Sequence, residues 1–246
     1  MPTLIPAASR AMAVFEVFAR EKRELSNSDV ARLLQVAESS TSDLLHTLHS
    51  LGYLMRTTRT RRFYPTARMF ETARQIAGND PLTAAAKAAV EQLGARSDES
   101  AFAGVPDPAC VKVVATQPSR LPLRYMLDVG ARASFHASAL GKALLALLPE
   151  DEARARLARH ALRPLTSHTV IDVNALMAQV AEGRSRGWWA SREEGAEGVH
   201  GLAVSGWLGE QPVGLSLAGP AERMKKNHDA YLSVLRGVRN ALLTDS

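Results

Sequence analysis

Hydrophobic and polar residues recur with the period of an α-helix in the segment from Glu38 to Gly52. One side of this predicted helix is apolar and carries four leucines: Leu44, Leu45, Leu48 and Leu51. The other side carries short polar side chains: Ser39, Ser42, Asp43, His46 and Ser50. Since donors and acceptors in the DNA major groove distinguish the base pairs, a helix with this outer face is suited to that groove.

The segments on either side of this helix predict a helix-turn-helix followed by a wing. Upstream, Ser26 is expected to cap a short helix, with Asp29 as its capping-box partner and with Leu25 and Val30 as a hydrophobic staple. Two short helices joined by a tight turn match the helix-turn-helix motif. Downstream, Gly52 ends the second helix, and residues 53–64 predict two short strands around a basic tip.

A leucine stripe or a run of arginines also occurs in domains that bind no nucleic acid, so the order of these elements decides the prediction. The expected DNA contacts are polar positions of the second helix and arginines of the wing: Ser39, Ser40, Ser42, Asp43, His46, Arg56, Arg59, Arg61 and Arg62. Wing arginines are expected to meet phosphates, which position a protein without specifying sequence. A metal site at His46 and His49 is less favoured, because no third ligand is implied.

A helix stop and a new helix start at residues 78–81 predict a domain boundary. We expect a DNA-binding domain at residues 1–78, an alanine-rich linker helix at residues 79–96, and a second domain at residues 97–246. In that domain, strands are predicted at residues 101–105, 111–115, 123–129, 202–207 and 213–217. Helices are predicted at residues 138–148, 173–186 and 221–243. Mixed helices and strands with short connections indicate an α+β fold with an antiparallel sheet.

Composition narrows the class of protein further. Hydrophobic residues make up 46% of the 246 positions, enough for a buried core, and no apolar run reaches the roughly 18 residues of a membrane span. The first residues do not resemble a secretory signal, and the single cysteine, Cys110, fits a reducing cytosol as a buried thiol. Residues 1–78 hold 11 of the 30 lysines and arginines but 7 of the 25 acidic residues. This excess favours a polyanionic partner.

The chain resembles the IclR family of bacterial transcription regulators over nearly its full length. The resemblance lies in Leu25–Ala31, in Ser39–Leu45 with Leu51-Gly-Tyr53, in Gly130–Ala146, in Thr166–Thr169, in Gly187-Trp-Trp189 and in Glu194–Ala203. It implies a winged helix-turn-helix and a GAF-like domain that binds an effector, assembled as a dimer or a dimer of dimers. Departures from the family pattern are Asp43, where Arg is frequent, Gly201, where Cys is frequent, and Ser191, where Asp is common.

The resemblance also implies where an effector binds: Ser138, Ala139, Leu140, Gly141, Ser191, Gly201 and Ser216. The start of the helix after His136 offers free N–H groups and a positive dipole end, which suit a carboxylate. Ser138 is explained equally well by a capping role alone and by capping plus ligand contact. In the predicted strand at Trp188 and Trp189, one side chain is expected in the core, and the other at the pocket or an interface.

Two hypotheses of different classes follow. The favoured one is a cytoplasmic, homo-oligomeric transcription regulator of a catabolic or metabolic operon that binds a double-stranded DNA operator. A small effector, expected to be a carboxylic acid, would modulate it, and no cofactor, metal, membrane contact or catalytic residue is expected. The alternative is a metabolite-binding module or small-molecule hydrolase whose N-terminal domain mediates protein contacts. His136, Ser138 and Lys142 suggest a serine nucleophile, but no Gly-x-Ser-x-Gly motif and no suitably placed acid accompany them.

Overall fold

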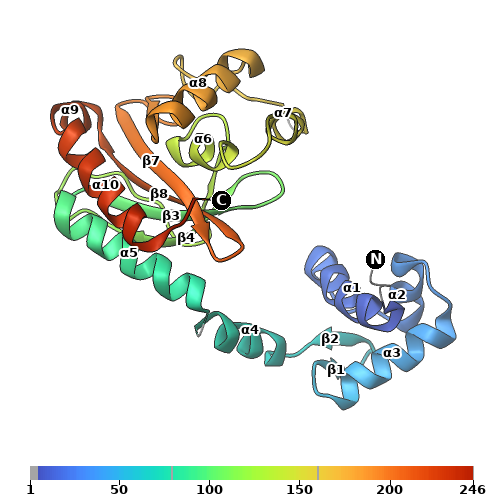
Figure 1. Cartoon of the computed structure of the whole chain (residues 1–246). Helices are drawn as coiled ribbons and strands as arrows, with labels where there is room; N and C mark the ends of the chain where they lie inside the picture. The colour runs from blue at the N-terminus through green and yellow to red at the C-terminus, as the bar shows by residue number, and fades with distance from the viewer. Residues whose placement is uncertain (1–4, 79, 160, 246) are drawn as a thin grey trace. The chain divides into compact units, whose positions relative to one another are not determined.

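The computed structural model describes residues 5–78, 80–159 and 161–245 (Figure 1). The predicted α+β fold is confirmed: N-terminal helices are followed by an antiparallel sheet with helices on its faces. The chain divides into two compact units, Met1–Asn79 and Asp80–Ser246. None of the described helices is both long enough and apolar enough to cross a membrane.

The first unit is a winged helix-turn-helix. Its elements are α1 (Pro6–Glu21), α2 (Asn27–Leu34), α3 (Glu38–Ser50), β1 (Leu54–Arg56), β2 (Phe63–Pro65) and α4 (Arg68–Gly78). The predicted capping box is present, because the Ser26 hydroxyl accepts from the Asp29 N–H and the Asp29 carboxylate accepts from the Ser26 N–H. The core of this unit gathers side chains from every element up to β1: Val14, Val17, Phe18, Leu25, Val30, Leu45, Leu48 and Leu54.

The leucine stripe of α3 is shorter than the sequence pattern predicts. Leu45 and Leu48 are buried and Leu44 is half-buried, whereas 52% of Leu51 is exposed. Leu51 is the C-cap residue, and Gly52 follows with a positive φ of 77°. The backbone therefore leaves the helical path at this point, and the next side chain on the apolar face turns to solvent. The prediction that Leu51 faces inward is wrong.

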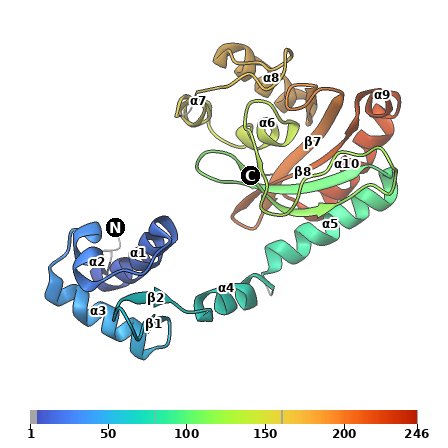
Figure 2. The same cartoon turned by 180° about the vertical axis from the view of Figure 1, so that it is seen from behind.

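The second unit is built on a six-stranded antiparallel sheet with the order β5-β4-β3-β8-β7-β6. Its strands are β3 (Ser100–Pro106), β4 (Val111–Gln117), β5 (Arg132–Ala133), β6 (Trp189–Arg192), β7 (Val199–Leu208) and β8 (Gln211–Pro220). Its helices are α5 (Pro81–Ser97), α6 (Ala139–Leu145), α7 (Glu150–Ala158), α8 (Val173–Arg186), α9 (Ala221–Lys226) and α10 (His228–Leu242). Helices α5 and α10 cover one face of the sheet, and α6 covers the other, as the two opposite views show (Figures 1 and 2).

The alanine-rich helix expected at residues 79–96 corresponds to α5. Its inner face is buried in the main core of the second unit, where Ala86, Ala89, Val90 and Leu93 meet the sheet and α10. The small alanine side chains let the helix lie close to the strands. The helix is therefore part of the second unit's framework.

Two other predicted elements differ in the structure. Residues 123–129, predicted as a strand, form no regular element; Leu123 and Val129 are exposed, while Tyr125 and Leu127 pack against the sheet face near Phe102. The segment passes over the sheet instead of joining it. The closing helix predicted at residues 221–243 is two helices, because the backbone at Asn227 departs from helical angles between α9 and α10.

The contrast between Leu45 and Leu51 gives a test of the first unit. Leu45→Ala is expected to lower the free energy of unfolding by about 2–5 kcal/mol, because Leu45 is fully buried. Leu51→Ala, the same change at an exposed position, is expected to cost about 0.5 kcal/mol or less. Denaturant unfolding of the full chain, followed by circular dichroism, measures both. Equal losses would contradict the assignment of Leu45 to the core.

Candidate functional site

The outer face of α3 is open to solvent along its length. Ser39, Ser40, Ser42, Asp43 and His46 are all exposed. On the inner side, Thr41 is fully buried and its hydroxyl donates to the Ala37 carbonyl at 3.1 Å. The predicted polar residues therefore form one continuous exposed face, and the buried residues beneath them fix the orientation of the helix.

The turn between α2 and α3 is held by side chains from α2. Asn27 donates from Nδ2 to the Glu38 carbonyl at 3.1 Å.

Asp29 lies 3.7–3.8 Å from the guanidinium groups of Arg23, Arg32 and Arg62. The Ser26 N–H and hydroxyl, followed by Arg23 and Arg62, hold the pKa of Asp29 below its ordinary value. One carboxylate thus links the cap of α2 to the wing.

The four predicted wing arginines divide into two pairs. Arg56 donates from Nε to the Arg61 carbonyl at 2.9 Å and lies over the Phe63 ring, and Arg62 reaches Asp29. In the described part of the chain, the side chains of Arg59 and Arg61 have no hydrogen bond or ion pair. Both are exposed at the tip of the hairpin.

The tip of the wing is tied to the segment before α2. Glu24 accepts hydrogen bonds from the hydroxyls of Thr57, at 3.0 Å, and Thr60. These bonds, the one from Thr60 first, hold the pKa of Glu24 below its ordinary value. The wing therefore presents the cations of Arg59 and Arg61 to solvent from an anchored hairpin.

The second candidate site is a cavity between α6 and the sheet, called here the α6 cavity. Its volume open to the centres of water-sized molecules is about 80 Å³. Six of the seven predicted effector residues line it: Ser138, Ala139, Leu140, Ser191, Gly201 and Ser216. Gly141 does not, because it faces away from the cavity; a Cβ there would lie 2.4 Å from the Ser134 carbonyl oxygen.

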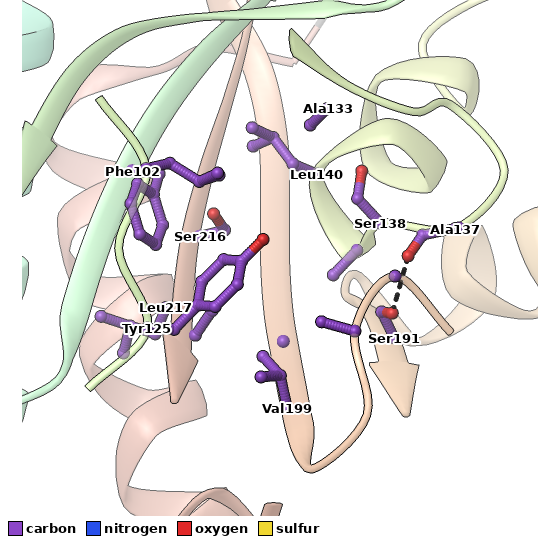
Figure 3. Close-up of a pocket in the computed structure, with 16 residues that line it drawn as sticks. Phe102, Tyr125, Ala133, Ala137, Ser138, Leu140, Ser191, Val199, Ser216 and Leu217 are labelled. Carbon is purple, nitrogen blue, oxygen red and sulfur yellow. Dashed lines mark hydrogen bonds between the residues drawn. The ribbon is translucent and has the colours of Figure 1, made fainter. Parts of the chain in front are cut away.

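Hydroxyl groups supply the polar side chains of the α6 cavity (Figure 3). Ser138 caps α6 by accepting from the Gly141 N–H at 2.9 Å, and it donates to the Ser134 carbonyl at 2.7 Å. Ser191 donates to the Ala137 carbonyl at 2.9 Å. The hydroxyls of Ser216 and Tyr125 have no hydrogen-bond partner among the described residues. Burial raises the pKa of Tyr125, which keeps its hydroxyl protonated as a donor.

The wall of this cavity opposite α6 is aromatic and aliphatic, and none of its residues is among the predicted effector contacts. Phe102 and Tyr125 meet edge to face with ring centroids 6.1 Å apart, and Leu127 and Val199 also line the space. Tyr125 and Leu127 come from the irregular segment at residues 123–129, for which the pattern predicts a strand. Alternating side chains in an irregular segment carry no signal of which face they meet, so no sequence pattern points to these residues.

A buried ion pair stands behind the α6 cavity. The ammonium group of Lys142, 1% exposed, lies 2.7 and 2.6 Å from the two carboxylate oxygens of Glu194 and donates to the Ala190 carbonyl at 3.2 Å. Burial lowers the pKa of Lys142, and the charge of Glu194 opposes this shift. The hydroxyls of Thr166 and Thr169 donate to the carbonyls of Glu193 and Glu194. Together these contacts fix residues 193–199, which supply one wall of the cavity.

The residues that suggest a serine nucleophile are each engaged with other partners. His136 hydrogen bonds through Nε2 to the Arg163 carbonyl at 3.0 Å, Lys142 is paired with Glu194, and Ser138 serves α6 as its cap. His46 and His49 are both exposed. Within residues 5–78, 80–159 and 161–245, no group of three or more His, Cys, Asp or Glu side chains is placed to hold a metal ion.

Comparison with known proteins identifies the family. The family model of the IclR helix-turn-helix domain matches residues 7–57, and that of the bacterial transcriptional regulator IclR C-terminal domain matches residues 74–242. The chain belongs to the IclR family. As a member, it is a ligand-responsive, DNA-binding transcription regulator.

Relatives in the family align over most of their length. The HTH-type transcriptional regulator XynR of Escherichia coli K12 is 27% identical over 235 residues, which cover 95% of this chain and 92% of XynR. The Pca regulon regulatory protein of Pseudomonas putida is 25% identical over 205 residues, which cover 82% of this chain and 69% of that protein.

Solved structures of IclR-family proteins share the fold. The IclR of Thermotoga maritima has a TM-score of 0.61 at 18% identity, covering 96% of this chain and 98% of its own. A family regulator from Brucella abortus has a TM-score of 0.66 at 18% identity, covering 97% and 93%.

The buried ion pair makes a prediction about stability. Lys142→Met is expected to lower the free energy of unfolding by about 3–5 kcal/mol, because it leaves the Glu194 carboxylate buried without its partner. The double variant Lys142→Met/Glu194→Leu is expected to recover most of this loss, since no unpaired charge remains. Denaturant titration measures both. If the double variant is no more stable than Lys142→Met, the unpaired carboxylate does not explain the loss.

Proposed function

We propose that this IclR-family chain binds a palindromic DNA operator as a homo-oligomer, and that a small carboxylic acid in the α6 cavity changes its affinity for that operator. The observation that carries the DNA-binding proposal is the exposed polar face of α3 beside a wing tip with two exposed arginines. Because operators with two-fold symmetry match two-fold protein dimers, at least a dimer is expected. A dimer of dimers would present two such pairs.

The proposed DNA contacts on α3 are Ser39, Ser40, Ser42, Asp43 and His46. The N-cap residue of α3, Ala37, has no side chain that accepts from the first N–H groups. These N–H groups and the positive end of the helix are thus available to a phosphate. Asp43 stands where a phosphate would be repelled, so we assign it to a cytosine amino group, which a carboxylate accepts from in the major groove.

For the wing, we propose that Arg59 and Arg61 make the phosphate or minor-groove contacts. Arg56 and Arg62 are already engaged, with the Arg61 carbonyl and with Asp29. Their proposed role is to hold the tip in position, with Arg62 exchanging Asp29 for a phosphate on binding. This division refines the sequence prediction, which treats all four arginines as equivalent.

The proposed effector is small and has a compact apolar body. The space of about 80 Å³ open to the centres of water-sized molecules is small beside the 630 Å³ of the largest-volume cavity among those described. Among the described residues, no charged side chain lines it, so a carboxylate would be bound by neutral donors. The Tyr125 and Ser216 hydroxyls can donate, and the start of α6 adds its dipole. The proposed contacts are Ser138, Ala139, Leu140, Ser191, Gly201 and Ser216, with Tyr125 added; Gly141 is left out, because it does not line the cavity and its N–H is bonded to Ser138.

Residues 1–78 are the proposed DNA-binding part and residues 97–246 the proposed effector-binding part, joined by the helix at 79–96. The burial of Ala86, Val90 and Leu93 against the sheet supports a helix that moves with the second unit. An effector changes operator affinity only if it binds two arrangements of the paired DNA-binding units with different free energies. One relative is named as the regulatory protein of a regulon, which supports control of an operon by this chain. The DNA target supports a cytoplasmic location.

The wing arginines test the DNA contact. Arg59→Ala/Arg61→Ala is expected to weaken binding to the region upstream of the chain's own gene. The slope of log K for DNA binding against the logarithm of the salt concentration is also expected to become shallower, by about 0.9 for each phosphate that is no longer neutralised. The matched control is Arg120→Ala/Arg159→Ala, which removes two exposed arginines of the second unit. Gel-shift titration over a range of salt measures the slope. An unchanged slope in the wing variant would exclude these two arginines from the contact.

The hydroxyls of the α6 cavity test the effector site. In a thermal-shift screen of small carboxylic acids, a ligand that binds only the folded chain raises its melting temperature. Ser216→Ala and Tyr125→Phe are each expected to weaken the best ligand about tenfold, the effect of removing one hydrogen bond to a charged group. Ser233→Ala, on the exposed side of α10, is the control. Equal affinity in all three variants would place the ligand elsewhere.

A further inference from the structure

A second cavity lies on the other face of the sheet from α6, along the edge strand β6. The Ser191 hydroxyl points to Ala137 on the α6 side. Because side chains alternate along a strand, Ala190 and Arg192 point to the opposite face. There the cavity is enclosed by residues of β6, β7, α9 and α10, with a volume of about 630 Å³. We call it the basic groove.

Positive side chains are concentrated in the basic groove. Arg192 and His200 are paired in register on β6 and β7, and Lys225 and His228 face them from α9 and α10. In the described part of the chain, the side chains of Arg192 and Lys225 have no ion pair or hydrogen bond. Burial lowers the pKa of His200, so the cations of the groove that have no counterion among the described residues are Arg192 and Lys225. An anion bound between these two side chains would compensate their charge.

The acidic residues near the groove do not supply that counterion. His228 contacts Asp229 at 2.9 Å, but Asp229 is fully exposed and is not part of the lining. Glu193 and Glu222 act on His200 from a distance, and neither lines the groove. The net charge of the lining side chains is therefore positive.

The aromatic wall of the groove is held by several contacts. The guanidinium of Arg186 lies 3.9 Å from the centre of the Trp188 ring, and the His228 ring meets Trp188 edge-on at 4.8 Å. Arg186 also donates to the Glu182 carboxylate at 2.7 Å and to the Trp188 carbonyl at 3.1 Å. Since Glu182 compensates the charge of Arg186, the described cations of the groove that have no counterion are Arg192 on β6 and Lys225 on α9.

We propose that the basic groove binds a small multivalent oxyanion, a phosphate ester or a polycarboxylate, on the opposite face of the sheet from the α6 cavity, with which the groove shares Ser191 and Gly201. Its volume lies in the range of roughly 300–1,000 Å³ that is usual for small-molecule sites. Arg192 and Lys225 provide charge-assisted hydrogen bonds, which are the strong ones for such oxygens. The groove takes its charge from side chains, whereas the described side chains of the α6 cavity are neutral, so the two sites select different ligands.

The test uses the full-length chain and two probes, inorganic pyrophosphate and citrate, which separate the phosphate source from the carboxylate source. Binding is followed by calorimetry and by tryptophan fluorescence, since Trp188 lines the groove. Saturable binding of at least one probe is expected at constant ionic strength. Trp188→Phe is expected to remove the fluorescence change while calorimetric binding persists.

Charge reversal locates the site. Lys225→Glu is expected to weaken binding of the probe about tenfold or more, and Arg192→Gln by a similar factor. Lys226→Glu is the matched control, because it makes the same change one residue along α9 at an exposed position outside the lining. The variants are checked for unchanged melting temperature.

Three results would overturn the proposal. The first is the absence of saturable binding of either probe to the wild-type chain. The second is an equal loss of affinity in Lys225→Glu and Lys226→Glu, which would indicate a general charge effect. The third is that a short DNA duplex of random sequence binds the chain in a way that Lys225→Glu weakens, while neither pyrophosphate nor citrate displaces the duplex. None of these results depends on the α6 cavity, so failure here and failure of the proposed effector site are distinguishable.

Discussion

The α6 cavity exists because buried polar contacts hold α6 against the sheet. Lys142 reaches from the middle of α6 to Glu194 and to the Ala190 carbonyl, and the Ser205 hydroxyl donates to the Ala143 carbonyl at 2.7 Å. A buried charge pair has a strict geometry, since the cost of desolvation is offset only when the two groups stay together. Apolar packing of Leu140, Leu144 and Ala143 holds α6 as well, and the polar contacts add directional restraints to it. The ion pair therefore helps to set the distance between helix and sheet.

The first unit uses the same principle at its surface. Asp29 caps α2 and at the same time lies near Arg62 of the wing, while Glu24 accepts hydrogen bonds from Thr57 and Thr60 of the hairpin. In both units, polar side chains hold the elements on which the proposed binding groups stand. Those groups are the guanidinium groups of Arg59 and Arg61 and the hydroxyls of Ser216 and Tyr125. None of them has a hydrogen-bond partner among the described residues.

Local chemistry explains which features can be predicted from the sequence. The capping box at Ser26 and Asp29 and the exposed face of α3 depend on residues three or four apart, and the structure has both. The prediction for Leu51 fails because the periodic pattern continues one residue beyond the point where the backbone leaves the helix. The pairing of Lys142 with Glu194 joins residues far apart in the chain, and Tyr125 enters the cavity from an irregular segment. Neither has a local pattern, because the fold alone brings these residues together.

The hydroxyl groups of the α6 cavity can account for the strength with which the proposed effector would act. A tenfold change in operator affinity requires a difference of about 1.4 kcal/mol in the effector's binding free energy between two arrangements of the protein. One hydrogen bond from a neutral hydroxyl to a carboxylate is worth about that much. Tyr125 lies on a segment that passes over the sheet without joining it, whereas Ser216 lies within β8, hydrogen bonded on both sides. A shift of the Tyr125 segment alone would therefore suffice to make binding differ between the two arrangements, with the sheet unchanged.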